Sequence, residues 1–170
     1  MMKTHTLQRR QCIKKPLSEV FAFFSEPDNL ALLTPRKLGF EILTPPPIQM
    51  NKGALIDYTI KLLGIRIRWT TLITDFEQPR KFVDVQLRGP YSYWHHSHEF
   101  RETRDGTEMT DTVTYALPFG ILGKIVRELI VKRQLDAIFN YRKRAVEAVF
   151  SQERAGASHP QKARRRSKKS

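Results

Sequence analysis

Three of the five histidines fall within one short stretch that alternates like a β-strand. Side chains of a strand alternate between its two faces, so His96 and His98 share one face. Trp94 and Phe100 flank them on that face, while His95 lies on the other. We expect the face bounded by Trp94 and Phe100 to point into the protein. Two imidazoles held there can transfer protons, hold a ligand or bind a metal ion.

The hairpin that follows offers a carboxylate partner. Asp105-Gly106 is a dipeptide typical of hairpin turns. A two-residue turn at this dipeptide places His96 opposite Tyr115. The same register places Phe100 opposite Asp111. All these positions fall on the inward face, so Asp111 is predicted to lie near the histidines.

The strand before the histidines offers a second carboxylate. Asp84 alternates with two valines, and burial alone would direct the valines inward. Pairing of Gln86 with Trp94 across the following turn instead places Asp84 opposite His96. The residues alone leave both orientations of this strand open.

Three kinds of chemistry are open to Asp84, His96, His98 and Asp111. Buried polar groups need partners, so the four can simply hydrogen-bond one another and stiffen the fold. A histidine held by a carboxylate can also orient a polar ligand or act as a general base. Two histidines at i and i+2 on a strand can, thirdly, chelate a metal ion with one aspartate. We favour the first interpretation, keep all four as catalytic candidates, and expect no metal or other cofactor.

A meander of strands must position these residues. Alternating residues predict strands over 54–62 and 65–76, joined by a turn at Gly64. Three more strands are predicted over 81–87, 93–102 and 108–117. The sequence therefore predicts five consecutive antiparallel strands.

Smaller elements precede the meander. A strand is predicted over 4–13, and Pro16 is expected at the first position of a helix with a phenylalanine-rich face. A second short helix is expected over 28–33. A short strand over 40–44 ends at the three prolines 45–47, which cannot donate to a ladder.

A long helix is predicted after the meander. From Phe119 to Phe150 apolar residues recur at helical spacing, and Lys and Arg fill the other face. At 1.5 Å per residue this helix is roughly 45 Å long. Only the concave face of a curved sheet can cover its apolar stripe, so the fold class is α+β. Such a helix cannot touch every inward side chain, and a cavity is expected.

Aromatic side chains dominate the predicted inward face. This lining suits an apolar small molecule fixed by a few polar groups, although aromatics at strand spacing are also typical of an ordinary core. The predicted ligand-binding residues are Phe24, Tyr58, Trp69, Asp84, Gln86, Trp94, His96, His98, Asp111 and Tyr115.

The net charge of +13 is concentrated near one end of the chain. Seven basic and no acidic residues lie in 154–170, which leaves 23 basic and 17 acidic residues, or +6, in the rest. We predict one domain over 1–150 and a disordered basic tail over 151–170. Residues 162–169 can contact nucleic acid or an anionic surface weakly and without specificity.

The sequence gives only a little information on the cellular compartment and the oligomeric state of the protein. The one cysteine, Cys12, cannot form an internal disulfide and is expected to be a buried, inert thiol. No apolar run is long enough for a signal peptide or a membrane span. We expect a cytoplasmic protein, either a monomer or a homodimer.

The order of elements resembles the START-like or SRPBCC superfamily, the helix-grip fold, over residues 3–150. Several stretches are similar to a bacterial branch of ligand-binding SRPBCC and polyketide cyclase/dehydrase-like proteins. They are Phe21-Ala22-Phe23-Phe24, Phe82-Val83-Asp84, Gly89-Pro90-Tyr91, Trp94–Phe100 and Tyr115-Ala116-Leu117-Pro118. The resemblance implies a pocket that usually works without metal, and it favours the register in which Asp84 faces inward.

Three functions remain open. The leading expectation is a non-catalytic protein that binds a small apolar, lipid-like or polyketide-like molecule between the sheet and the long helix. An alternative is a cyclase or dehydratase with His96 or His98 as base and Asp84 or Asp111 orienting it. Another is an anion-binding or interaction protein that acts through its basic tail.

Overall fold

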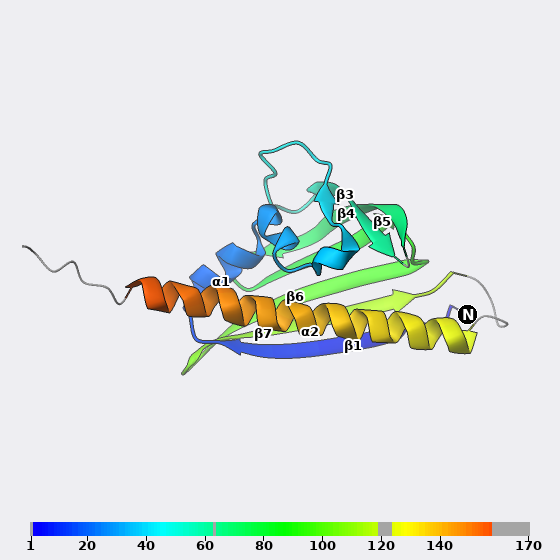
Figure 1. The fold of residues 1–170 in the computed structure, drawn as a ribbon. Coiled ribbons are helices and arrows are strands. Elements are labelled where there is room, and N and C mark those ends of the chain that lie inside the picture. Colours follow the sequence, from blue (N-terminus) through cyan, green and yellow to red (C-terminus); the bar gives the residue numbers. More distant parts are fainter. Residues whose placement is uncertain (1, 63, 119–123, 158–170) are drawn as a thin grey trace, which may run out of the picture.

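A seven-stranded antiparallel sheet wraps against one long helix, with strand order β1-β7-β6-β5-β4-β3-β2. The computed structural model describes residues 2–62, 64–118 and 124–157. Figure 1 shows α2 running along the sheet, with α1 and two short 3₁₀ helices beside it. The elements are β1 His5–Ile13, α1 Leu17–Phe24, η1 Pro27–Ala31, η2 Arg36–Leu38, β2 Glu41–Ile42, β3 Leu55–Leu62, β4 Ile65–Glu77, β5 Lys81–Arg88, β6 Tyr93–Thr103, β7 Gly106–Ala116 and α2 Lys124–Ala157. This architecture confirms the predicted α+β helix-grip fold.

The β6–β7 hairpin differs from the predicted register by two residues. Thr103 pairs with Gly106, so Arg104-Asp105 forms the turn. Asp111 therefore lies opposite His98 instead of Phe100. Similarly, Tyr115 lies opposite Trp94 instead of His96. Because side chains alternate with a period of two, every residue stays on its predicted face.

Gly106 explains why the turn lies one step earlier. It has a φ of 131° at the first position of β7, a conformation that other residues rarely adopt. A Cβ atom there would lie 2.3 Å from the carbonyl oxygen of Ile13. The glycine thus serves a close crossing with the end of β1, and the turn does not need it.

The β5–β6 pairing is the one favoured by the resemblance. Asp84 pairs with His96, and Val85 with His95. Val83, on the other face of β5, is buried as well, but further along that face Val85 is half-buried and Leu87 is exposed. The face that carries the valines is thus the outer one, and the apolar pattern alone points to the wrong orientation.

Other predicted elements need small corrections. Pro16 is the N-cap of α1 and not its first residue. The helix predicted over 28–33 is the 3₁₀ helix η1, η2 was not predicted, and the strand predicted over 40–44 shrinks to β2 before the prolines. Cys12 is exposed, because it lies on the outer face of β1.

The long helix also differs from its prediction at both ends. It is described from Lys124, and the predicted first turn, 119–123, lies outside the described residues. At the other end it continues to Ala157, into the segment predicted as a tail. The rest of that segment, 158–170, lies outside the described residues. No helix within the described ranges is long and apolar enough to cross a membrane.

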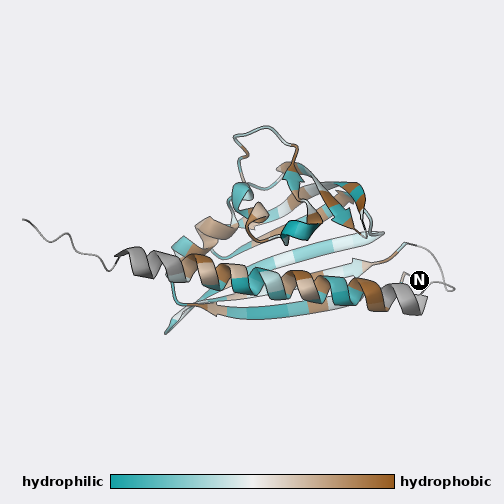
Figure 2. Ribbon diagram, in the orientation of Figure 1, coloured by the Kyte–Doolittle hydropathy of each residue, from teal (hydrophilic) through white to brown (hydrophobic). Residues whose placement is uncertain are grey.

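Two apolar clusters form the core. The first joins α1 to the sheet and to the end of α2, and Phe21 makes edge-on ring contacts in it. The second joins Val113 and Tyr115 of β7 to Leu135 and Phe139 of α2. Figure 2 shows the apolar and polar residues interleaved along α2, whose apolar stripe supplies both clusters. The two histidines lie on β6 between Phe100 of the first cluster and Trp94 beside the second.

Candidate functional site

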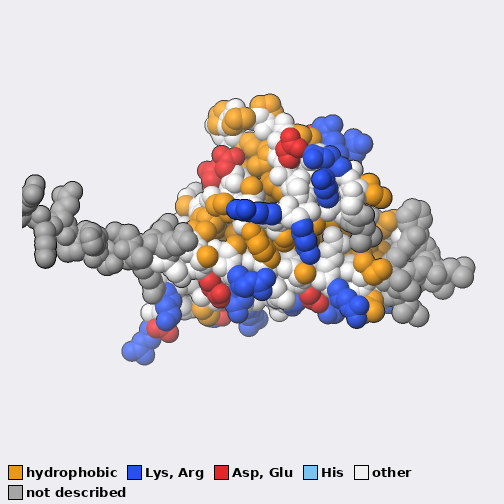
Figure 3. Space-filling view, viewed as in Figure 1, with side chains coloured by type: hydrophobic (Ala, Val, Ile, Leu, Met, Phe, Trp, Pro, Cys, Tyr) orange, Lys and Arg blue, Asp and Glu red, His pale blue; other side chains and the backbone are white. Residues whose placement is uncertain are grey.

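A cavity of about 160 Å³ lies between the sheet, the short helices and α2. Its wall is mainly apolar and includes the ionisable side chains of Glu26, Asp84, His96, His98 and Arg142. On the face seen in Figure 3, apolar side chains reach the surface above α2 and are flanked by Lys and Arg. The lining residues are Phe24, Glu26, Pro27, Leu30, Leu33, Thr34, Leu38, Phe40, Met50, Ile56, Tyr58, Ile60, Trp69, Thr71, Ile73, Phe82, Asp84, Trp94, His96, His98, Leu135, Ile138, Phe139 and Arg142.

Most of the predicted ligand-binding residues border this cavity. Strand alternation brings them to one wall, because each occupies an inward position of β3 to β6, apart from one residue on α1. They are Phe24, Tyr58, Trp69, Asp84, Trp94, His96 and His98. Gln86, Asp111 and Tyr115 do not line the cavity, so their predicted placement needs correction.

The three predicted residues that do not line the cavity have other structural roles. Gln86 closes the β5–β6 turn, because its Nε2 donates to the carbonyl oxygen of Tyr91 (2.7 Å) and its Oε1 accepts from the Tyr91 N–H (3.3 Å). Tyr115 packs in the second apolar cluster. Asp111 lies behind the histidines, because the two-residue shift of register moves it from Phe100 to His98.

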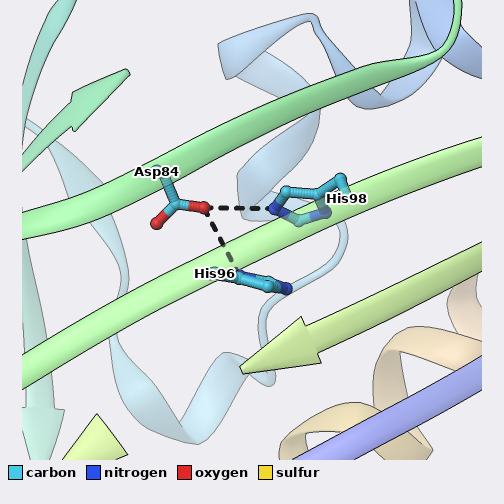
Figure 4. A group of neighbouring side chains, drawn as sticks. All are labelled: Asp84, His96 and His98. Carbon is cyan, nitrogen blue, oxygen red and sulfur yellow. Dashed lines mark hydrogen bonds and ion pairs between the residues drawn. The ribbon is translucent and has the colours of Figure 1, made fainter. Parts of the chain in front are cut away.

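Asp84, His96 and His98 converge on one point (Figure 4). One oxygen of Asp84, Oδ2, lies 3.4 Å from His96 Nδ1 and 3.1 Å from His98 Nε2. The two rings have centroids 3.8 Å apart. Phe82 stacks on His98 at 4.1 Å, and Phe139 meets the edge of His96 at 5.7 Å. Packing thus fixes both imidazoles against the same carboxylate.

Asp111 contacts the other nitrogen of each ring. Its Oδ1 lies 2.9 Å from His96 Nε2, where it forms a hydrogen bond, and 2.8 Å from His98 Nδ1. The second contact is close but poorly aligned, so His98 Nδ1 has no hydrogen bond. Arg142 of α2 approaches the same oxygen to 3.5 Å. Two imidazoles therefore lie between two carboxylates, with an arginine beyond Asp111.

The cluster shifts the pKa of every titratable member. Burial opposes ionisation of Asp84, but His96 and the hydrogen bond from His98 outweigh it and lower the Asp84 pKa. Burial likewise opposes ionisation of Asp111, yet the two histidines and Arg142 hold its pKa well below the usual value. Both carboxylates are therefore ionised at neutral pH.

The two histidines respond in opposite directions. Burial lowers the pKa of His96, and the nearby charge of His98 lowers it further. Burial also disfavours the charged form of His98, but Asp111 and Asp84 outweigh it and raise its pKa. The geometry thus separates a neutral imidazole from one that holds a proton more tightly, as acid–base chemistry requires.

Several buried donors at the cavity make no hydrogen bond within the described part of the chain. Trp69 Nε1 and both Nε and Nη1 of Arg142 are buried without a hydrogen bond among the described residues. Trp69 and Arg142 both line the cavity. An unpaired buried N–H costs about 1–3 kcal/mol, so such groups indicate a missing acceptor. An oxygen of a bound molecule would supply one.

Arg142 was missed by the sequence reasoning. It was counted among the basic residues of the exposed helix face. Its spacing from Leu135, Phe139 and Val146 is 7, 3 and 4 residues, which places it on the apolar stripe of α2. A charged residue at an apolar position was the signal that could have identified it.

Fold and site together define a helix-grip protein with an internal, mainly apolar cavity. The sequence model of the family "Polyketide cyclase / dehydrase and lipid transport" matches residues 13–139. The chain belongs to this family, of the SRPBCC type. Membership supports a role in binding a small molecule or in cyclase chemistry. No match was found among curated proteins.

Solved structures support the same fold. The chain is similar to the Zhui aromatase/cyclase from Streptomyces sp. R1128, with a TM-score of 0.72 and 14% identity, covering 93% of this chain and 100% of that one. The di-domain ARO/CYC StfQ of the steffimycin biosynthetic pathway gives 0.67 and 17%, covering 90% and 52%. Protein NE0264 from Nitrosomonas europaea gives 0.65 and 15%, covering 88% and 96%. At these identities the likeness shows the fold alone.

Proposed function

We propose that this protein binds a small, mainly apolar molecule, lipid-like or polyketide-like, with an oxygen acceptor at one end. The observation that carries the proposal is the pairing of an apolar cavity with buried N–H groups of Trp69 and Arg142 on its wall that make no hydrogen bond. Apolar pockets with a few convergent polar groups are typical ligand sites. A simple core would leave neither the space nor the donors.

The cavity limits the size of the part that is enclosed. Its volume of about 160 Å³ is close to that of an engineered cavity of roughly 150 Å³ that binds benzene. One ring or a short chain therefore fits inside. The acceptor oxygen of the ligand would face Trp69 and Arg142, as a carboxylate, carbonyl or phenolic oxygen can.

The two tryptophans of the chain both line the cavity, so their fluorescence reports its occupancy. We expect phenol, a single ring with one oxygen, to change the emission of Trp69 and Trp94 saturably. Ile60→Phe fills space at the wall and should weaken binding at least about tenfold. Ile65→Phe, at an exposed position of the neighbouring strand, is the matched control. Absence of saturable binding, or equal binding by both variants, would contradict the proposal.

Native mass spectrometry of the freshly purified protein tests the class of ligand. A stoichiometric lipid or polyketide, released by organic extraction, would identify what the cavity holds. A co-purified molecule without any oxygen would contradict the role that we assign to Trp69 and Arg142.

A cyclase or dehydratase activity is the second candidate function. It is supported by the carboxylate-held His96 on the cavity wall, which is suited to general-base work. This candidate predicts that His96→Ala abolishes turnover and leaves affinity for the bound molecule within about threefold. Equal loss of turnover and affinity would instead indicate a binding role for His96.

A further inference from the structure

Three donor atoms at the cavity wall have the spacing of metal ligands. One donor atom each of Asp84, His96 and His98 lies within 4.8 Å of the other two. Asp84 Oδ2 faces Nδ1 of His96 and Nε2 of His98. The two nitrogen–oxygen distances are 3.4 and 3.1 Å. With bonds of about 2.0–2.2 Å, two ligands on one ion lie about 3.0 Å apart at a right angle and about 3.4 Å apart at a tetrahedral angle. Both distances fall in this range.

Asp111 provides the orientation that a metal-binding histidine pair needs. A ligating histidine usually donates its other ring N–H to a carboxylate, which fixes the tautomer. Asp111 Oδ1 accepts a hydrogen bond from His96 Nε2 at 2.9 Å, and it lies 2.8 Å from His98 Nδ1 without the alignment of a hydrogen bond. These are the two nitrogens that face away from Asp84. When each ring carries its proton on the side of Asp111, both remaining lone pairs face Asp84.

A cation between the two ring nitrogens and Asp84 would relieve the repulsion among these acceptors. Two lone pairs and a carboxylate oxygen are all acceptors, and they repel one another unless a positive charge lies among them. In a neutral His98 whose proton lies on Nε2, the hydrogen bond goes to Asp84, and Nδ1 makes none although Asp111 Oδ1 lies 2.8 Å away. A metal ion in place of that proton would be a shared partner for His96 Nδ1 and His98 Nε2, and it leaves the His98 proton on Nδ1, beside Asp111.

The site would be open on the side of the cavity. Asp84, His96 and His98 line the cavity, whereas Asp111 lies behind them. An ion would therefore have a protein ligand set on one side and free positions toward the bound molecule. Two aspartates and Arg142 sum to −1 with neutral histidines, so a dication leaves +1. That charge suits an anionic oxygen of the ligand.

We propose that Asp84, His96 and His98 bind a divalent transition metal ion of the Zn²⁺, Fe²⁺ or Co²⁺ type, with Asp111 as the positioning residue. Two imidazoles and one carboxylate are a ligand set that suits these ions. The sequence alone favoured a cluster without metal, and the shared orientation by Asp111 is what changes that view. The site rests on protein side chains alone, so it does not depend on the proposed apolar ligand.

The test uses Co²⁺, whose visible absorption reports on its ligands. The full chain without an affinity tag is treated with a chelator, desalted and titrated. We expect one equivalent to bind with a saturable spectrum, and Zn²⁺ to displace it. Asp84→Asn keeps the shape of the side chain and should abolish the signal, as should His96→Ala. His95→Ala, on the opposite face of β6, is the matched control and should bind normally.

Asp111→Asn provides a graded readout. Loss of such an outer carboxylate lowers metal affinity about 10–100-fold while the ligand set stays the same. We expect that loss with a Co²⁺ spectrum of unchanged shape. Circular dichroism of each variant shows whether it folds, and the wild-type titration needs no variant at all.

Two results would overturn the proposal: no saturable Co²⁺ or Zn²⁺ binding by the wild type, or equal loss of binding in His95→Ala and His96→Ala. Saturable phenol binding by the chelator-treated protein in the same sample would show that the apolar cavity binds its ligand without the metal ion, so the two proposals can fail separately.

Discussion

Replacing Arg142 by methionine should stabilise the protein and weaken ligand binding. Methionine keeps an apolar stem of similar length beside Phe139, whose ring lies 5.2 Å from the guanidinium carbon. The change removes two buried N–H groups that have no hydrogen bond. Asp111 loses a contact at 3.5 Å but retains both histidines.

The opposing contributions can be compared. Two unsatisfied buried donors cost about 1–3 kcal/mol each. A cation–π contact contributes about 0.5–2 kcal/mol, and a long ion pair on an already paired carboxylate adds little. We therefore expect Arg142→Met to raise the free energy of unfolding by about 1 kcal/mol. For a chain of this size that is a rise in melting temperature of about 2–4 °C.

Thermal and urea unfolding followed by circular dichroism would measure this change. Arg144→Met, at an exposed position of the same helix, should stay within about 0.5 kcal/mol of wild type. Affinity for benzoate should fall in Arg142→Met and not in Arg144→Met. A loss of more than about 2 kcal/mol in Arg142→Met would refute the reasoning, because the arginine would then serve the fold.

Four further outcomes are expected. Asp111→Asn should destabilise the protein by about 3 kcal/mol in urea unfolding, since it takes one partner from a buried charged network; a change below about 1 kcal/mol would contradict that network. Gly106→Ala should lower the melting temperature measurably, because its Cβ would lie 2.3 Å from the Ile13 oxygen; an unchanged value would mean that β1 and β7 separate freely. Phe21→Ala should cost about 3–5 kcal/mol in the same unfolding assay, as it empties the first apolar cluster. Removing residues 158–170 should abolish salt-dependent binding to a DNA duplex, measured by fluorescence anisotropy, and leave the melting temperature unchanged; retention of binding would place the anion contact on the folded part.

The faces of the strands could be predicted from sequence because alternation has a period of two. Trp69 and His96 were assigned inward from spacing alone, and both are buried. Register was harder to predict, because it depends on which residues make the turn. Asp105-Gly106 has the composition of a turn, but the glycine is needed for its crossing with β1. That requirement comes from β1, almost a hundred residues away in the chain.

The composition of the site was predictable only in part. Asp84 could be placed once its strand register was chosen, since it lies opposite His96. Arg142 could be assigned to the apolar stripe of α2 from its spacing, but not to the cavity, because the part of the stripe that borders the cavity depends on how α2 crosses the sheet. The layering of Asp111 behind the histidines depends on a register shift of two residues, which leaves the alternation pattern unchanged.

The polar cluster is hard to explain as a device for stability. Buried ion pairs can often be replaced by apolar residues of similar volume with no loss of stability, because desolvation offsets their attraction. Here two aspartates, two histidines and an arginine lie between two well-packed apolar clusters. Nitrogen atoms of His98 and Arg142 in this cluster are also buried without a hydrogen bond among the described residues. An arrangement that served only the fold would be more stable with those groups replaced, whereas one that receives an acceptor oxygen or a metal ion needs them where they are.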